Sequence, residues 1–303
     1  MVSLRQAIVD QVEAIGGRHD SAGVYGGPAG DPGLTGPGSV SWLVNGDLAS
    51  VLLAGTSAIV IEMLHPSVTA GVEEHSDYRR DPLRRARQTL GFVLATTFGN
   101  TEAATRTVDV VRAVHGRVNG VRPDGVAYAA MDPVLIGWVH TAIPWMILRT
   151  YERFNRPLTA AQRDAYLAEQ AVIGRMGGAD TVPESMAELE EYVAAMRPAL
   201  AVTDQTQGFL DFLFAGPAVG PALPAPLERR RQRFDALAGM SIAPAWARAM
   251  TRTDAPGAVR RRVLSPYMAA TARTLRWAFA EPPHVVLARQ RAGASVAVAA
   301  VGR

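Results

Sequence analysis

Apolar residues recur every three or four positions through most of this chain, which is the pattern of helices that bury one face. Aspartate, proline and capping-box signals mark where several helices begin: Asp47, Asp81-Pro82, Asp132-Pro133, Thr159 with Gln162, and Ser185 with Glu188. The predicted helices cover residues 3–15, 47–64, 81–98, 101–118, 132–154, 159–173, 185–201, 206–214, 227–238, 243–250 and 257–278. Alternation typical of strands occurs only in short pieces such as 285–287. The predicted fold class is therefore mainly α, a single large all-helical domain.

The ends of the chain have a different character from its middle. Residues 16–46 are rich in glycine, proline and aspartate, so this stretch is predicted to be a functional loop or a wrapping arm. The pattern divides the chain into an N-terminal helix and arm over 1–46, an all-helical domain over 47–280 and a C-terminal tail over 281–303.

Two apolar runs, 48–64 and 134–148, raise the question of a membrane. Both are shorter than the roughly 20 residues that a spanning helix needs, and they contain Glu62 and His140. We interpret them as buried core helices, and contact with a membrane surface stays open as an alternative. Charged residues in the first helix leave no apolar signal core, so we expect a cytoplasmic location.

The composition excludes several chemistries. The 303 residues include no cysteine, so disulfides, zinc–thiolate sites, iron–sulfur clusters and cysteine nucleophiles are excluded. All 31 basic residues are arginine, which excludes a Schiff-base lysine and a P-loop lysine. A net charge of +3 is small for a nucleic-acid-binding protein, and no nucleic acid is expected as a partner.

The most informative single residue is His115, which shares a helical stripe with Val108, Val111, Val114 and Val118. This spacing predicts a ring on the buried face among valines, where its nitrogens need partners. One interpretation is a core histidine bonded to a carbonyl or a carboxylate. The other is a metal ligand, and in a helical chain without cysteine a haem iron is a natural candidate.

Two further groups are candidates for chemistry. His140 lies in the very apolar helix 132–154, four residues before Pro144, and is either a pocket wall or a structural histidine at a bend. The helix 81–98 opens with an arginine cluster and places Arg85 and Thr89 on one face. These arginines either lie at a helix end that faces solvent or donate hydrogen bonds to an anionic ligand.

A series of short motifs runs through residues 45–215 in a fixed order: His65-Pro66-x-Val68, Gly71-Val72, His75-Ser76, Arg84–Thr89, Phe98-Gly99, Val114-His115-x-x-Val118-x-Gly120, Tyr128, Asp132-Pro133, Trp138-Val139-His140 and Tyr151-Glu152. In this order they resemble the oxygenase family that contains the fungal MpaB protein and the bacterial rubber oxygenase called latex clearing protein. The resemblance implies an all-helical domain built around a buried pocket for haem b.

The resemblance also implies roles for particular residues. His115 matches the histidine that binds the haem iron, and His140 belongs to a second motif, as a supporting residue or as the ligand instead. Arg85 and Thr89 match catalytic donors on the distal helix, but Gln88 stands where the rubber oxygenases have a lysine. Arginines on this helix can also pair with haem propionates, and Arg84 and Arg87 complete the expected cofactor-binding set.

The expected function is a haem b-dependent oxygenase that acts with dioxygen on an apolar substrate, lipid-like or isoprenoid. The apolar helices 48–64 and 132–154 are the expected walls of its substrate site. Two alternatives remain from the residues alone. One is a haem-binding or hydrophobic-ligand-binding protein without turnover, and the other is a helical, arginine-rich interaction protein.

Overall fold

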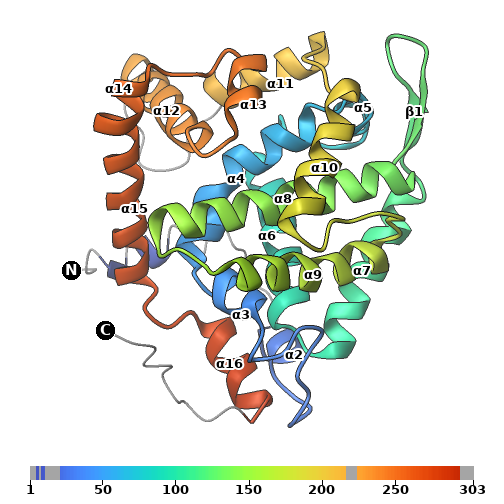
Figure 1. The fold of residues 1–303 in the computed structure, drawn as a ribbon, viewed down its shortest axis with the longest axis vertical. Helices are drawn as coiled ribbons and strands as arrows, with labels where there is room; N and C mark the ends of the chain where they lie inside the picture. The colour runs from blue at the N-terminus through green and yellow to red at the C-terminus, as the bar shows by residue number, and fades with distance from the viewer. Residues whose placement is uncertain (1–4, 7, 11–20, 216–223, 294–303) are drawn as a thin grey trace.

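The computed structural model describes residues 5–6, 8–10, 21–215 and 224–293, and it confirms a mainly α single domain (Figure 1). Its elements are α2 (Ser21–Tyr25), α3 (Val40–Asn45), α4 (Leu48–Met63), α5 (Pro66–His75), α6 (Pro82–Phe98), α7 (Thr101–His115), β1 (Asn119–Val121), β2 (Ala127–Ala129), α8 (Pro133–Phe154), α9 (Ala160–Gly177), α10 (Met186–Met196), η1 (Arg197–Ala199), α11 (Asp204–Ala215), α12 (Ala225–Met240), α13 (Ala245–Met250), α14 (Gly257–Val259), η2 (Arg260–Leu264), α15 (Ser265–Ala278) and α16 (Pro283–Arg291). Most of the first predicted helix lies outside the described residues.

Several helix starts follow directly from the local capping signals. The carboxylate of Asp81 accepts a hydrogen bond from the Arg84 amide at 2.9 Å, and α6 begins there as predicted. The capping box at the start of α9 is complete, since the side chains of Thr159 and Gln162 each accept from the other residue's backbone amide. Asp47 is the exception: its carboxylate pairs with Arg276 at 2.7 Å, which ties α15 to the start of α4.

Other local predictions were wrong. Residues 119–121 and 127–129 form a short antiparallel hairpin directly after α7, which ends at His115 and not at 118. Residues 285–287 lie in helix α16 and not in a strand. Residues 66–75 form helix α5, in which the His65 ring caps the start by accepting from the Ser67 amide at 3.2 Å. The arm also contains two helices, α2 and α3.

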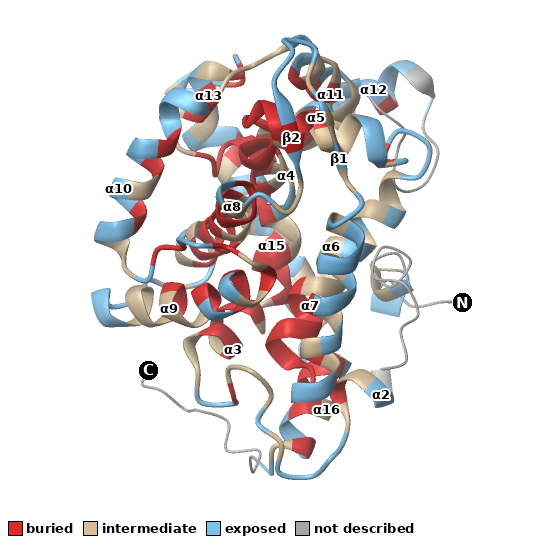
Figure 2. Cartoon of the chain, turned by 90° about the vertical axis from the view of Figure 1, so that its right-hand side faces the viewer, coloured by how far each residue is buried: buried red, intermediate tan, exposed pale blue. Residues whose placement is uncertain are grey.

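The core lies where α4 and α8 pack against each other, and Figure 2 shows buried residues concentrated in these two helices. Trp138 of α8 is fully buried and donates from its indole nitrogen to the Glu62 carbonyl of α4 at 3.2 Å. Helix α9 packs against the other side of α8, and α3 packs against α9. Both apolar runs are thus core helices, as predicted.

The N-terminal arm is held by the C-terminal helix α16. Arg291 is 4% exposed, and its guanidinium donates to the carbonyls of Tyr25, Asp31 and Phe98. These contacts join segments that are far apart in the sequence, and they keep α2 and α16 beside the ends of α6 and α7 (Figure 1).

No single helix among the described residues is both long enough and apolar enough to cross a membrane. Helices α4 and α5 reach the required length and hydropathy only as a pair, and they are bent by 107° at the break between them.

Candidate functional site

His115 is the last residue of α7 and is half-buried. The helix begins at Asn100, whose side chain accepts from the Ala103 amide at 2.8 Å. The face that His115 shares with buried Val108 points inward, as predicted, but the neighbouring Val114 is 48% exposed. The histidine therefore stands at the rim of the core and not deep within a valine layer.

His140 lies on α8 and is half-buried, with its ring packed between α6 and α9. Its ring meets the Phe92 ring of α6 edge-on, with 5.7 Å between the ring centres. On the other side it meets two glycines of α9: a Cβ atom added at Gly177 would lie 3.0 Å from the His140 Nε2 atom, and one at Gly174 would lie 3.2 Å from its Cβ atom. Burial lowers the pKa of His140 to about 4, and the charge of nearby His115 contributes in the same direction.

Two charged groups from other helices complete the cluster. Glu62 of α4 is buried, and burial raises the pKa of its carboxyl group to about 7, against the effect of the positive charge of Arg85. Burial also lowers the pKa of His115, and the charge of Arg85 lowers it further. The structure thus links four residues of four different helices in succession: Glu62 is near Arg85, Arg85 is near His115, and His115 is near His140.

Arg85 has unused hydrogen-bonding capacity. Its Nε atom is buried, and no residue in the described part of the chain accepts a hydrogen bond from it. A buried N–H donor without a partner is costly, so such a group in a polar cluster is a candidate ligand-binding donor.

The remaining residues predicted on α6 are placed less deeply. Arg84 is exposed, Arg87 is half-buried, and Gln88 is exposed. Thr89 is half-buried, and its hydroxyl donates to the Arg85 carbonyl within the same helix at 3.3 Å. The Thr89 donor is therefore engaged in a common helical contact, and its catalytic role stays a prediction.

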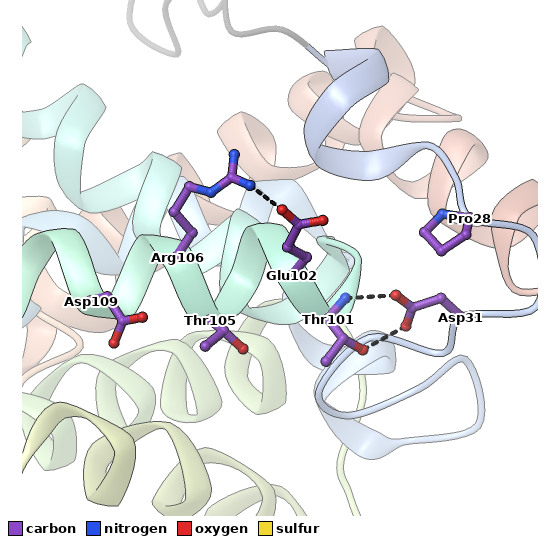
Figure 3. Close-up of a pocket in the computed structure, with 7 residues that line it drawn as sticks. All are labelled: Pro28, Asp31, Thr101, Glu102, Thr105, Arg106 and Asp109. Atoms are coloured by element: carbon purple, nitrogen blue, oxygen red, sulfur yellow. Dashed lines mark hydrogen bonds and ion pairs between the residues drawn. The ribbon is translucent and has the colours of Figure 1, made fainter.

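A small cavity lies beside His140 and has a volume of about 10 Å³, lined also by Thr141, Pro144 and Gln170. This space suits a single water molecule. A larger surface pocket of about 570 Å³ lies at the opposite end of α7 (Figure 3). There Asp31 accepts from the backbone amide and the hydroxyl of Thr101, at 2.9 and 2.6 Å, so its carboxylate serves to cap α7 and hold the arm.

The His/carboxylate group around α5 has structural partners. Tyr78 and Arg79 donate to Glu73, and Tyr128 donates to Glu74. The His75 ring is hydrogen-bonded to the Asn119 carbonyl at 3.2 Å. Across the described residues, no group of three or more metal-ligating side chains is found. A metal held through one histidine and a porphyrin does not need such a group.

The sequence interpretation missed Glu62, Phe92, Gly174 and Gly177 as members of this site. Glu62 was visible as a carboxylate inside an apolar run, which predicts a buried and perturbed group. The glycines gave no signal of their own, because only the packing of α9 on α8 shows that their missing side chains make room for His140.

The close approach at Gly174 predicts a measurable loss of stability. An alanine Cβ atom there would lie 2.8 Å from the Val182 Cγ2 atom and 3.2 Å from His140 Cβ, so the side chains must shift. We expect Gly174→Ala to lower the free energy of unfolding by about 1–3 kcal/mol. The control is Gly55→Ala in α4, which is exposed with nothing within 4 Å and is expected to gain up to about 1 kcal/mol. Denaturant unfolding of both variants checks this, and equal stabilities would contradict it.

The raised pKa of Glu62 predicts a pH dependence. Unfolding returns the carboxyl from a pKa of about 7 to its ordinary value of 4.5, so between these pH values the unfolded chain releases a proton that the folded protein keeps. This group therefore makes stability fall as the pH rises through that window, by on the order of 3 kcal/mol in total. Glu62→Gln removes the effect, so the variant should gain stability relative to the wild type between pH 4.5 and 8.

Unfolding curves of the wild type and Glu62→Gln across this pH range measure the difference. His140 and His284, whose pKa values burial lowers to about 4, act in the opposite direction but equally in both proteins. Glu190→Gln, which removes an exposed carboxylate of α10, is the control. If the stabilities of Glu62→Gln and Glu190→Gln follow the same pH dependence as that of the wild type, Glu62 does not have a raised pKa in the folded protein.

In a comparison with known protein families, the chain matches the model described as ER-bound oxygenase mpaB/B'/Rubber oxygenase, catalytic domain. The match covers residues 42–277, from α3 to the end of α15, and includes all four residues of the cluster. No curated protein and no solved structure matches the chain.

Proposed function

The chain belongs to the oxygenase family of mpaB and the rubber oxygenases, and from this membership we propose that it is a haem b-dependent oxygenase for an apolar substrate. The observation that supports this best is the juxtaposition of a half-buried His115, whose pKa is lowered by burial and by the charge of Arg85, with the buried Arg85 Nε atom, for which the described residues offer no acceptor. A neutral imidazole is the form that binds iron, and a free cationic donor suits a group on which negative charge develops.

The donor set of the cluster fits haem. His115 would bind the iron, because its ring stands at the rim, whereas His140 is enclosed by Phe92 and the α9 glycines. Haem needs far more space than the 10 Å³ beside His140, so we propose that it would lie on the His115 side of the cluster. Arg84 and Arg87, near the start of α6, would pair with the propionates. When bound, haem supplies the redox chemistry that activates dioxygen.

The chain's own residues then hold charge and protons. Arg85 donates hydrogen bonds into the site and compensates negative charge, with Thr89 a turn away on the same helix. Glu62, with a pKa of about 7, is able to hold or release a proton near neutral pH beside Arg85. Gln88 contributes no ammonium group, which distinguishes this site from the lysine-containing pattern of the rubber oxygenases.

The substrate class follows from the family and from the apolar surroundings of the site. The helices α4 and α8 were predicted to form the walls of the substrate site. Most of their apolar side chains instead pack against each other in the core. Leu83, Leu90 and Phe92 are half-buried apolar residues of α6, the helix that carries Arg85. We propose a lipid-like or isoprenoid substrate, and a cytoplasmic location remains a prediction.

The test is to express the protein with adequate iron and haem precursor and to record its spectrum. We expect a Soret band and a pyridine-haemochrome spectrum of haem b, at up to about one haem per chain. A colourless protein that also fails to take up added haemin would overturn the proposal. Oxygen consumption with unsaturated lipids then separates an oxygenase from a haem-binding protein without turnover.

A further inference from the structure

The positive charge of this protein is concentrated in its C-terminal third. Residues 225–291 contain 13 arginines and 4 carboxylates, a net charge of +9, whereas the whole chain carries only +3. The rest of the chain is therefore acidic, and the net charge of the whole hides a strongly basic region. Such a charge asymmetry points to an anionic partner for this region.

An exposed apolar stripe crosses the same region. Helical segments α14, η2 and α15 follow one another without a break from Gly257 to Ala278 and form one edge of the molecule (Figure 1). Their inner side buries Leu264 and Met268 against α12 and α4. Their outer side exposes large apolar side chains at helical spacing: Val259 (41%), Val263 (45%), Tyr267 (39%) and Trp277 (53%).

Exposed arginines flank this stripe. Three of them lie on the same helical run and three on α12, beside it: Arg261, Arg262, Arg273, Arg229, Arg230 and Arg233. Helix α12 is held there by Tyr267, whose ring packs on Phe234 at 4.9 Å between ring centres and whose hydroxyl donates to Asp235 at 2.6 Å. Within the described part of the chain, none of the six guanidinium groups makes an ion pair.

We propose that this face, the outer side of α14–α15 with the six arginines, docks on the surface of an anionic phospholipid bilayer. The valine and tryptophan side chains enter the boundary between headgroups and acyl chains, while Tyr267 keeps its contacts with α12. The arginines bind the phosphates around them. A run of 22 residues is about 33 Å long, so the helix would lie flat on the surface. Exposed aliphatic side chains such as Val259 and Val263 make few favourable contacts with a nucleic acid. They therefore favour a lipid surface as the partner of this face.

The docking surface is independent of the haem site, because none of its residues belongs to the Glu62–Arg85–His115–His140 cluster. It would nevertheless bring an enzyme for apolar substrates to the place where such molecules accumulate. Binding to vesicles can be measured with or without haem, so a failure here and a failure of the proposed function are distinguishable.

The test is sedimentation of the full chain with vesicles of equal parts phosphatidylcholine and phosphatidylglycerol, compared with phosphatidylcholine alone. We expect binding to the anionic vesicles only, weakened by added salt. Arg261→Glu/Arg262→Glu should lower the partition coefficient by at least about thirtyfold. The matched control is Arg80→Glu/Arg117→Glu, which makes the same charge change at exposed arginines outside this face and should have a much smaller effect.

A second pair of variants tests the apolar stripe. Val259→Ser/Val263→Ser should weaken vesicle binding by roughly tenfold or more, because two side chains no longer enter the bilayer. Val110→Ser/Val121→Ser, at valines that are 57% and 59% exposed elsewhere, should bind like the wild type. The proposal is overturned if the chain does not bind anionic vesicles, or if each variant pair behaves like its control. Loss of binding to a DNA duplex, but not to vesicles, in the arginine variant would also overturn it and assign the face to nucleic acid.

Discussion

Replacing His115 with alanine should yield a folded protein that retains no haem. The imidazole is the proposed protein bond to the iron, and without it the remaining contacts at the rim of α7 are too weak to hold the group through purification. The measurement is Soret absorbance per chain, together with helical circular dichroism to show that the fold persists. His115→Gly with added imidazole should regain the Soret band, because free imidazole can occupy the space of the missing side chain.

His140→Ala is the control for this prediction. His140 is packed between Phe92 and the glycines of α9, so its removal leaves a space that should lower the free energy of unfolding by about 2 kcal/mol or more. Haem binding should largely survive. If His140→Ala loses the haem and His115→Ala keeps it, His140 is the ligand and the assignment made here is wrong.

Replacing Arg85 with alanine should slow turnover about a hundredfold while the haem remains bound. The buried Nε atom of Arg85 has no hydrogen-bond partner among the described residues, so we assign this donor to negative charge that develops in the reaction. Removal of one such donor typically costs on the order of 3 kcal/mol in the transition state. The measurement is oxygen consumption per bound haem with the best lipid substrate found.

Two comparisons sharpen this result. Arg80→Ala removes an exposed arginine just before α6 and should leave turnover unchanged. Thr89→Val should have a smaller effect than Arg85→Ala, because its hydroxyl already donates to the Arg85 carbonyl. Normal turnover in Arg85→Ala would remove this arginine from the catalytic site and leave it only as the positive charge beside Glu62.

Several helix starts of this protein are decided within a few residues, and the sequence was sufficient to find these. Asp81, Asp132 and Thr159 each accept backbone hydrogen bonds at the first turn of a helix, which is a local interaction that needs no partner from elsewhere in the chain. The sequence also predicted the end of α4 near residue 64 but missed α5, because a proline can end one helix or begin the next. The structure shows that it begins α5.

The mainly α class, the core position of α4 and α8, and the candidate residues His115, His140 and Arg85 were all readable from the sequence, because periodicity and residue chemistry are local properties. Their grouping was decided only by tertiary structure. The packing of four helices brings Glu62, Arg85, His115 and His140 together, and the glycines of α9 become meaningful only against His140. Exposure is likewise a tertiary property: Val114 and Val108 look equivalent in the sequence, yet one faces solvent and the other is buried, because neighbouring helices cover only one side of α7.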